Sequence, residues 1–420
     1  MKGLKRIINL NYELFIAKRI IAGKKYKNSI SSPIIKIAIT AIALGIIIML
    51  IAVATGAGLQ YKIRDKMAGF KGHIQIVNYD ANNSDVSTTA IKKEQDFYPT
   101  FKHIKGIKNV QIFANKAGIL RTKTDFEGII FKGVSSDYDW SFFTEYMVEG
   151  RVPDFNQPRT REVLLSQTII NRLQLKLNDT IIATFIKTVN SKLPSNKKYI
   201  ITGIYNTGFL QFDKSMMIGD IREVQNLNKW TENEVGGFEV LLNDFDEIDE
   251  KGEEVYNNIS ATLNSKTIVD AYPNVFDWIQ LFDNNVWFII AIMILIAGIN
   301  MITALLVLIL ERVQMIGVLK ALGSNNTSIR KIFLYNATYL ILKGLFWGNI
   351  LGLTIIGIQH FFKIITLNPE TYYVATMPVY ISFTAILLLN IGTLILCFLM
   401  LIIPSFIITK ISPSKSIKFA

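Results

Sequence analysis

Four long apolar segments dominate the hydrophobic pattern of the chain, at residues 34–59, 284–310, 333–360 and 379–408. Each approaches or exceeds the ~20 residues that an α-helix needs to cross a bilayer. They are too long for the apolar part of a signal peptide, and no cleavage site of small residues accompanies the first one. The pattern predicts four transmembrane helices, the first of them a retained anchor, with a bend or a membrane exit at Pro404.

Polar segments flank and separate these predicted spans. The longest, residues 60–283, is large enough to fold around its own core. The others are an N-terminal segment at 1–33, a loop at 311–332, a short loop at 361–378 and a tail at 409–420. We therefore expect a large domain inserted between the first and second spans.

Within this large domain, short β-branched or aromatic runs alternate with helical patterns. This mixture predicts an α+β domain, compatible with two lobes. The predicted elements are strands at 72–78, 163–165 and 199–205, helices at 166–177 and 221–227, and an exposed loop at 187–198.

The composition agrees with a membrane part joined to a water-soluble part. Half of the residues are hydrophobic and the mean hydropathy is +0.32. The net charge of +12 is unevenly distributed, because residues 59–283 contain 27 of the 45 basic and 30 of the 33 acidic residues, a net charge of about −3. The basicity thus belongs to the flanks of the spans, which argues against nucleic-acid binding.

Basic residues mark three of the flanks as cytoplasmic, according to the positive-inside rule. We expect both termini and the loop at 311–332 inside, and the large domain outside, the cytoplasmic membrane. The short loop at 361–378 has only Lys363 and Glu370. The basic residues are Lys2, Lys5, Arg6, Lys18, Arg19, Lys24, Lys25 and Lys27 before the first span, Arg312, Lys320, Arg330 and Lys331 after the second, and Lys410, Lys415 and Lys418 at the end.

Two membrane-associated features have competing interpretations. Residues 4–27 mix apolar with basic positions, which predicts an amphipathic helix on the inner membrane surface or, alternatively, a solvated basic tail. Lys343 in the third span either reaches toward the interface or faces a polar interior. The same span carries glycines that predict close helix packing, namely Gly344, Gly348, Gly352 and Gly357.

The chain offers no convincing catalytic constellation. Its three histidines are scattered, its one cysteine, Cys397, lies in the fourth span, and it has none of the familiar metalloprotease, dithiol or hydrolase motifs. The acidic run at 243–254 lacks the spacing of a calcium loop and favours a solvated helix face. The phosphate-binding signature G-x-x-x-x-G-K-[ST] is also absent, so any ATPase that drives the protein must be another polypeptide.

The loop after the second span has a more specific pattern. Residues 311–323, from Glu311 to Gly323, form a short amphipathic segment between two spans, followed by the basic pair Arg330 and Lys331. Glu311 and Arg312 alone would also fit ordinary charges at the end of a spanning helix. The whole pattern favours a helix that docks on a cytoplasmic partner.

These residues resemble a known family. Asn300-Met301-Ile302-Thr303 and the segment 311–323 are similar to the second span and the coupling helix of the FtsX-like permeases, membrane subunits of type VII ABC transporters. Segments 149–153, 162–166, 173–179 and 201–208, with Asp213 and Gln225, resemble the MacB-like periplasmic core. Segments 22–25 and 62–76 are most similar to the lipoprotein-releasing permeases of the LolC/LolE type.

The resemblance implies a membrane subunit with four transmembrane helices and a periplasmic α+β domain, in the inner membrane of a bacterium. It also implies a separate ATPase, present in two copies, that holds ATP and Mg, so that this chain binds no cofactor or metal itself. Many relatives have Glu where Met315 stands, so any salt bridge that this Glu makes to the ATPase has no counterpart in this chain. The implied coupling residues are Glu311, Arg312, Met315, Ile316, Gly317, Leu319, Lys320, Leu322 and Gly323.

The resemblance further implies lipoprotein extraction, with membrane lipids around the protein and a second copy or a sister permease beside it. Acyl chains would enter a cavity lined by the first and second spans, and a periplasmic carrier would receive the lipoprotein. The implied cavity residues are Ile46, Met49, Val53, Ile292, Leu295, Ile299 and Asn300, and the implied carrier contacts are Lys192, Leu193 and Pro194, unless that segment is a plain connector.

Two other functions remain compatible with the residues. The same scaffold can relay the strokes of an ATPase to a periplasmic partner, such as a cell-wall hydrolase or an exporter component, without transporting a lipid. A membrane-anchored sensor would need no ATPase at all. Substitution of Gly317 and Leu319 by Asp separates these functions, because only the sensor would be indifferent to it.

Overall fold

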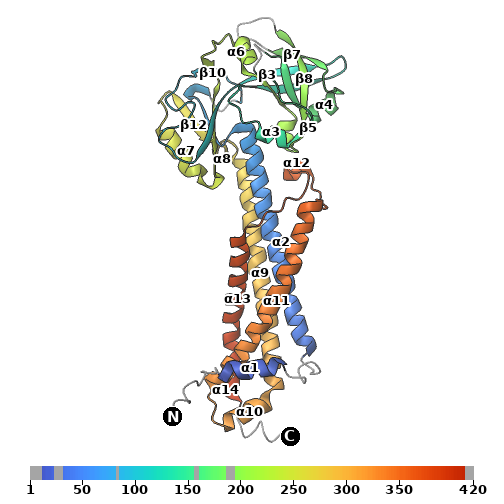
Figure 1. Ribbon diagram of the computed structural model, residues 1–420, viewed down its shortest axis with the longest axis vertical. Helices are drawn as coiled ribbons and strands as arrows, with labels where there is room; N and C mark the ends of the chain where they lie inside the picture. Colours follow the sequence, from blue (N-terminus) through green and yellow to red (C-terminus); the bar gives the residue numbers. More distant parts are fainter. Residues whose placement is uncertain (1–11, 23–31, 82–84, 156–159, 186–193, 412–420) are drawn as a thin grey trace, which may run out of the picture. The chain divides into compact units, whose positions relative to one another are not determined.

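The computed structural model describes residues 12–22, 32–81, 85–155, 160–185 and 194–411 (Figure 1). The chain divides into two compact units. The helical unit comprises Met1–Gly58, Gln280–Ile365 and Pro378–Ala420, and the outer unit comprises Leu59–Ile279 and Thr366–Met377. The predicted large domain at 60–283 corresponds to the outer unit. That unit also takes in residues 366–377, which the sequence placed in a short loop between the third and fourth spans.

Four helices in the described part of the chain are long and apolar enough to cross a membrane. They coincide with the four predicted spans, but three of them extend beyond the predicted limits, because a formed helix adds further residues at little cost. The fourth begins later than residue 379, since Ser382 caps it by accepting the Ala385 N–H at 3.1 Å. These helices are α2 (Ser32–Lys71), α9 (Pro273–Glu311), α11 (Asn326–Phe362) and α13 (Phe383–Ser405).

Three shorter helices complete the described part of the helical unit: α1 (Tyr12–Ala22), α10 (Val313–Ala321) and α14 (Ile407–Lys410). Helix α1 falls within the predicted amphipathic segment and packs against α11, and its Ala17 is buried. Helix α13 ends one residue after Pro404, where the sequence predicted a bend or an exit. Lys343 is exposed, and its ammonium lies 4.8 Å from the centre of the Tyr339 ring.

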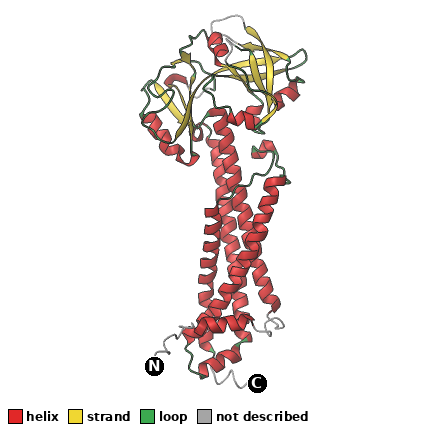
Figure 2. Cartoon of the chain, in the orientation of Figure 1, coloured by secondary structure: helices red, strands yellow, loops and turns green. Residues whose placement is uncertain are grey.

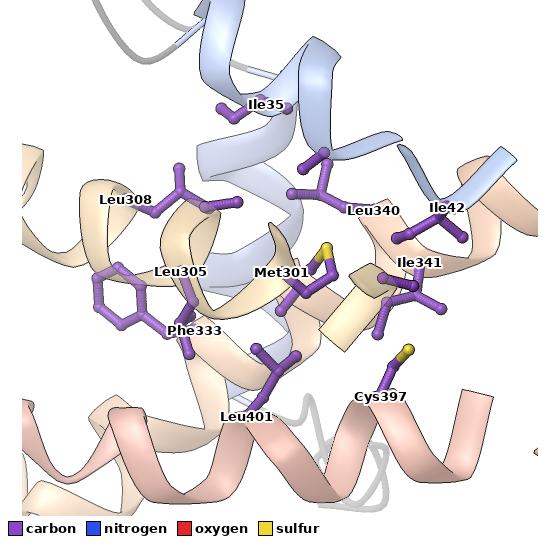
Figure 3. Packing of buried hydrophobic residues seen from close by; sticks show 14 of the residues in the cluster. Ile35, Ile42, Met301, Leu305, Leu308, Phe333, Leu340, Ile341, Cys397 and Leu401 are labelled. Atoms are coloured by element: carbon purple, nitrogen blue, oxygen red, sulfur yellow. The ribbon is translucent and has the colours of Figure 1, made fainter. Parts of the chain in front are cut away.

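The core of the helical unit is mainly aliphatic. Side chains from α2, α9, α11 and α13 meet in one cluster, in which Ile42, Met301, Leu340 and Leu401 are buried (Figure 3). Cys397 of α13 belongs to the same cluster. In a bilayer such a core is held by close packing and dispersion, because lipid tails are as apolar as the side chains themselves.

Three of the predicted glycines bring α11 close to α2. A Cβ atom at Gly344 would lie 2.7 Å from Ile42 Cβ, one at Gly348 would lie 2.8 Å from the Ala43 carbonyl oxygen, and one at Gly352 would lie 2.9 Å from Leu50 Cδ1. The prediction of close packing is confirmed for these positions. It is wrong for Gly357, around which a Cβ atom would find nothing within 4 Å.

The outer unit is built on a ten-stranded sheet with the order β12-β1-β11-β3-β4-β9-β6-β8-β5, in which β7 also pairs with β3 and β8. Figure 2 shows these strands with the helices around them. The strands are β1 (Ile74–Asn78), β2 (Ile91–Lys92), β3 (Ile107–Arg121), β4 (Phe126–Val134), β5 (Met147–Gly150), β6 (Glu162–Ser166), β7 (Thr180–Phe185), β8 (Ser195–Tyr205), β9 (Met216–Asp220), β10 (Glu234–Val235), β11 (Gly237–Leu242) and β12 (Leu263–Thr267), of which β2 and β10 form a separate pair.

The long strand β3 takes part in two sections of this sheet. Its first half pairs with β11, from Ile107 opposite Leu242 to Phe113 opposite Gly237. Its last four residues pair with β7, which closes a ring in the order β3-β4-β9-β6-β8-β7. Ring closure removes the exposed edges that an open sheet would have there.

The remaining helices of the outer unit are short: α3 (Ser141–Glu145), α4 (Gln167–Leu173), α5 (Leu210–Asp213), α6 (Ile221–Asn228), α7 (Ile248–Asn257), α8 (Ile268–Ala271) and α12 (Pro369–Tyr372), with 3-10 turns η2 (Tyr79–Ala81) and η3 (Phe245–Glu247). The predicted strands and the helix at 221–227 are confirmed. The helix predicted at 166–177 stops at Leu173, because Gln174 is left-handed with φ 51°. The acidic run at 243–254 is confirmed as helical in α7 only from Ile248 onward, with Asp249, Glu250 and Glu253 exposed.

Candidate functional site

Helix α10 occupies the segment that the sequence singled out as a docking helix. Arg312, with φ −109°, separates it from α9. At its other end Gly323 adopts φ +91°, and the Ser324 N–H returns to the Leu319 carbonyl at 3.0 Å. Asn325 then starts α11 by accepting the Ser328 N–H at 2.7 Å. A helix with two defined ends is thus held between two spans.

One face of α10 packs inside the helical unit. Ile316, Gly317 and Leu319 are buried, and Met315 packs partly against the same apolar cluster. A side chain inside the unit cannot also cover a partner protein. Ile316, Gly317 and Leu319, which were predicted as coupling residues, therefore anchor the helix within this unit, and their role in coupling stays a prediction.

Lys320 has a partner within this unit as well. Its ammonium donates to the carbonyl oxygens of Ile408 at 2.8 Å and Ile411 at 2.7 Å. These carbonyls lie at the end of α14, where a helix leaves acceptors without intrahelical donors. Lys320 therefore ties α10 to the end of the fourth span, and its predicted role in coupling stays a prediction.

The opposite face of α10 remains open. Val318 is 50% exposed and Leu322 is 79% exposed, and Glu311, Gln314, Ala321 and Gly323 are also exposed. Positions 314, 318 and 321–322 are one helical turn apart, so they form one stripe. Arg312 is half-buried, with Nη2 3.9 Å from Glu311 Oε1. Val318 was not among the predicted coupling residues, although the four-residue spacing from Gln314 to Leu322 identifies it.

The predicted cavity residues do not share one surface in this chain. Ile46 and Met49 are fully buried, and Ile46 faces Gly348 of α11. At these two positions the structure has core packing where the sequence predicted a cavity wall. Val53 and Asn300 are half-buried, and the Asn300 amide donates to the Ile296 carbonyl at 3.0 Å.

The predicted residues of α9 do form an open surface. Ile292, Leu295 and Ile299 are all exposed and lie at helical spacing on one stripe. Helix α2 has exposed apolar residues of its own, at Ile37, Leu44 and Ile48. The open apolar surface of the first span is thus formed by residues other than those predicted.

The predicted carrier loop is only partly described. Lys192 and Leu193 lie outside the described residues, and Pro194 is exposed just before β8. The loop predicted at 187–198 is wrong for its last four residues. Ser195–Lys198 belong to β8 and pair with β7, with Ser195 opposite Phe185.

The outer unit contains a buried ion pair at the centre of its sheet. Lys132 Nζ lies 2.7 Å from Glu239 Oε1 and also donates to the Phe70 carbonyl at 2.7 Å. Gln111 and Gln75 donate to the same carboxylate at 3.0 Å and 3.3 Å. Burial lowers the pKa of Lys132. Both oxygens of the carboxylate have donors, which identifies a structural pair rather than a reactive one.

A second buried carboxylate lies at the end of α5. Asp213 accepts hydrogen bonds from the Thr207 hydroxyl at 2.8 Å and from the Gly208 N–H at 2.9 Å. Burial outweighs these bonds and raises the pKa of Asp213 to about 6. His73 is half-buried, which lowers its pKa to about 4, and its Nδ1 accepts the Leu242 N–H. Among the described residues, no three His, Cys, Asp or Glu side chains gather as metal ligands.

Two family models match the chain. The model described as FtsX-like permease C-terminal matches residues 287–413, and the model described as MacB-like periplasmic core domain matches residues 37–257. The second match alone covers more than half of the chain, and the two together include most of all four spans and of the outer unit.

Individual relatives are similar over nearly their full length. The lipoprotein-releasing system transmembrane protein LolC of Neisseria meningitidis is 21% identical, over 97% of this chain and 99% of that protein. LolC of Xylella fastidiosa is 18% identical, over 94% and 96%. The crystal structure of the periplasmic region of MacB from Actinobacillus actinomycetemcomitans is 13% identical, over 49% of this chain and 92% of that one, with a TM-score of 0.32.

Proposed function

Because the chain belongs to the FtsX-like permeases with a MacB-like periplasmic core domain, which are ABC transporter permeases, we propose that it extracts lipoproteins from the inner membrane. The observation that carries this proposal is the similarity to lipoprotein-releasing permeases across 97% of the chain. The large insertion at 60–283 between the first two spans agrees with it. The released lipoprotein would pass to a periplasmic carrier.

A separate ATPase would drive the cycle from the cytoplasm. Its two copies would bind ATP and Mg, and this chain would bind neither. The exposed stripe of α10, centred on Val318 and Leu322, would rest on the ATPase, while Ile316 and Leu319 hold the helix in the permease. Met315 and Lys320 would act from within the permease as supports. The termini would then be cytoplasmic and the outer unit periplasmic.

The acyl chains would meet the exposed apolar stripes of α2 and α9. The stripe of α2 is made by Ile37, Leu44 and Ile48, and that of α9 by Ile292, Leu295 and Ile299. Each CH₂ group that leaves the lipid costs ~0.8 kcal/mol unless an apolar surface receives it. A second permease, identical or a sister chain, would complete the cavity by bringing its own stripes.

The α10 contact is tested by the double substitution Val318→Asp and Leu322→Asp. Val148 of β5 is equally exposed, at 56% against 50% for Val318, so Val148→Asp is a matched control outside the predicted contact. We expect the α10 variant to retain less than about one tenth of the co-purifying ATPase, because loss of a central apolar contact weakens binding strongly. Equal amounts of ATPase with both variants would contradict the proposed contact.

The substrate is tested by mass spectrometry of the gently purified native complex. An ATPase together with triacylated lipoproteins would support extraction. An ATPase with a cell-wall hydrolase or another periplasmic partner, and no lipoprotein, would replace extraction by mechanical transmission. A complex without any ATPase would overturn both functions and leave the sensor.

A further inference from the structure

The chain between the third and fourth spans forms a compact segment that belongs to the outer unit. This segment, residues 366–377, is called the strap below. Thr366 pairs with Thr376, and the Leu367 N–H donates to the Ala375 carbonyl at 3.0 Å, so the two ends of the strap lie together. Between them Asn368 caps α12 by accepting the Glu370 N–H at 2.9 Å. The strap is thus a folded element and not a bare connector.

Tyr373 is the centre of the contacts between the strap and the rest of the outer unit. Its ring stacks on Phe209, with centroids 5.0 Å apart, and meets Trp278 edge-on at 5.5 Å. Phe209 is fully buried. Tyr373 has a left-handed backbone with φ 58°, which is uncommon for a residue with a side chain and costs energy. The aromatic contacts offset that cost.

A buried lysine holds the backbone of the same residue. Lys66 is 4% exposed, and its ammonium donates to the Tyr373 carbonyl at 3.1 Å. Beside it, a Cβ atom at Gly208 would lie 3.8 Å from Ala375 Cβ, and Gly208 itself donates to Asp213. The strap therefore contacts α2 through Lys66, α9 through Trp278, and the turn that contains Gly208 and Phe209.

The exit from the strap is fixed to α2 as well. In the helical unit the Tyr380 N–H donates to the Ala54 carbonyl at 2.9 Å, and a Cβ atom at Gly58 would lie 2.6 Å from the Pro378 carbonyl oxygen. Helix α2 therefore holds the chain on both sides of Met377, at Ala54 in one unit and at Lys66 in the other. The covalent chain enters the strap from α11 and leaves it toward α13.

From these contacts we propose that the strap couples the third and fourth spans to the outer unit, with Tyr373 as the positioning residue. A displacement of α11 or α13 is passed through a folded strap to α2, α9 and the turn at Phe209, whereas a loose loop would absorb it. The proposal rests on the proposed function for its mechanical meaning, since ATP hydrolysis supplies the displacement.

The test compares Tyr373→Ala with the conservative Tyr373→Phe, which keeps the ring, and with Thr371→Ala, an exposed position of the same strap. Each variant is purified as the complex with its ATPase. Three quantities are measured: ATP hydrolysis, release of a triacylated lipoprotein from proteoliposomes, and hydrogen exchange of residues 366–377. We expect the ATP hydrolysis rate of Tyr373→Ala to stay within about twofold of wild type. Its lipoprotein release should fall about tenfold, because two aromatic pairs are lost.

The exchange measurement separates the outcomes. Faster exchange in the strap of Tyr373→Ala with unchanged release would overturn the coupling role, and so would equal losses in Tyr373→Phe. If the wild-type complex hydrolyses ATP but releases no lipoprotein, the proposed substrate is wrong. The coupling role of the strap is then tested by hydrogen exchange and ATP hydrolysis alone. Equally fast exchange of the strap amides in wild type and in Tyr373→Ala would overturn this role.

Discussion

The helical unit and the outer unit of this permease bury different kinds of side chain. The core of the helical unit is an aliphatic cluster, and α11 approaches α2 so closely that only glycine fits at 344, 348 and 352. The outer unit instead buries Lys132 and Glu239 at the centre of its sheet, each with a side chain 1% exposed. Close packing of helices holds the first core, whereas the second, also largely apolar, includes a paired buried charge.

The difference follows from the solvent that each unit is built for. In a bilayer, lipid tails compete equally for apolar side chains, so helices gain from close packing and not from burial as such. In water the outer unit gains its stability from burial, and a buried charge is tolerated only with its partner and its hydrogen bonds. Substitutions in the two units should therefore lower stability for different reasons.

The largest effect is expected when the buried ion pair loses one partner. Glu239→Leu leaves the Lys132 ammonium without its carboxylate and should lower the free energy of unfolding of the outer unit by about 3–5 kcal/mol. The measurement is denaturant unfolding of the purified full chain, followed by tryptophan fluorescence. The double variant Lys132→Met and Glu239→Leu should be much closer to wild type, because no charge remains buried. A double variant as unstable as the single one would contradict this account.

The next effect is a dependence on pH. Burial raises the pKa of Asp213 from 3.8 to about 6, so the folded chain binds a proton there more tightly than the unfolded chain. The resulting stabilisation is complete below about pH 4 and is lost as the pH rises through about 6, to the extent of roughly 2–3 kcal/mol. Unfolding curves of wild type and Asp213→Asn, measured from about pH 4 to about pH 7.5, should therefore diverge. Parallel curves would show that Asp213 is not the titrating group.

The smallest effect concerns the packing of the spans. Gly348→Val should destabilise the helical unit by about 1–3 kcal/mol, because its Cβ atom would press on the Ala43 carbonyl and on Ile46. Gly357→Val is the control on the same helix, since its Cβ atom meets nothing within 4 Å. Thermal unfolding in detergent micelles compares the two. Equal losses would indicate a general cost of valine in α11 rather than a clash with α2.

Local patterns predicted much of this architecture. Four apolar segments identified four spans, and the short segment after the second span proved to be a separate helix. The strands at β1, β6 and β8 were found from alternation and β-branched residues. Helix ends were less predictable: α4 stops at Gln174, and residues 195–198 join β8 because β7 lies beside them.

The sequence predicted the residue range of the candidate site but not which of its side chains are exposed. Residues 311–323 contain α10, yet Ile316 and Leu319 face inward, Lys320 is bound to α14, and Val318 was overlooked. Ile46 and Met49 are likewise buried against other helices. In α10 and in α2, apolar side chains occur on the face that is buried in the chain and also on the face that is exposed. Hydrophobicity alone therefore does not show which apolar face other helices cover.

The sequence by itself determined that this chain spans a membrane four times, because hydrocarbon requires every backbone polar group to be satisfied within a helix and this needs a long apolar run. It also determined that the chain lacks the phosphate-binding signature of its expected ATPase partner. Only the tertiary structure decided which face of α10 is open, how β7 closes the ring, and that the strap belongs to the outer unit. Those features depend on contacts between residues far apart in the chain, such as Lys66 with Tyr373, and no local pattern encodes them.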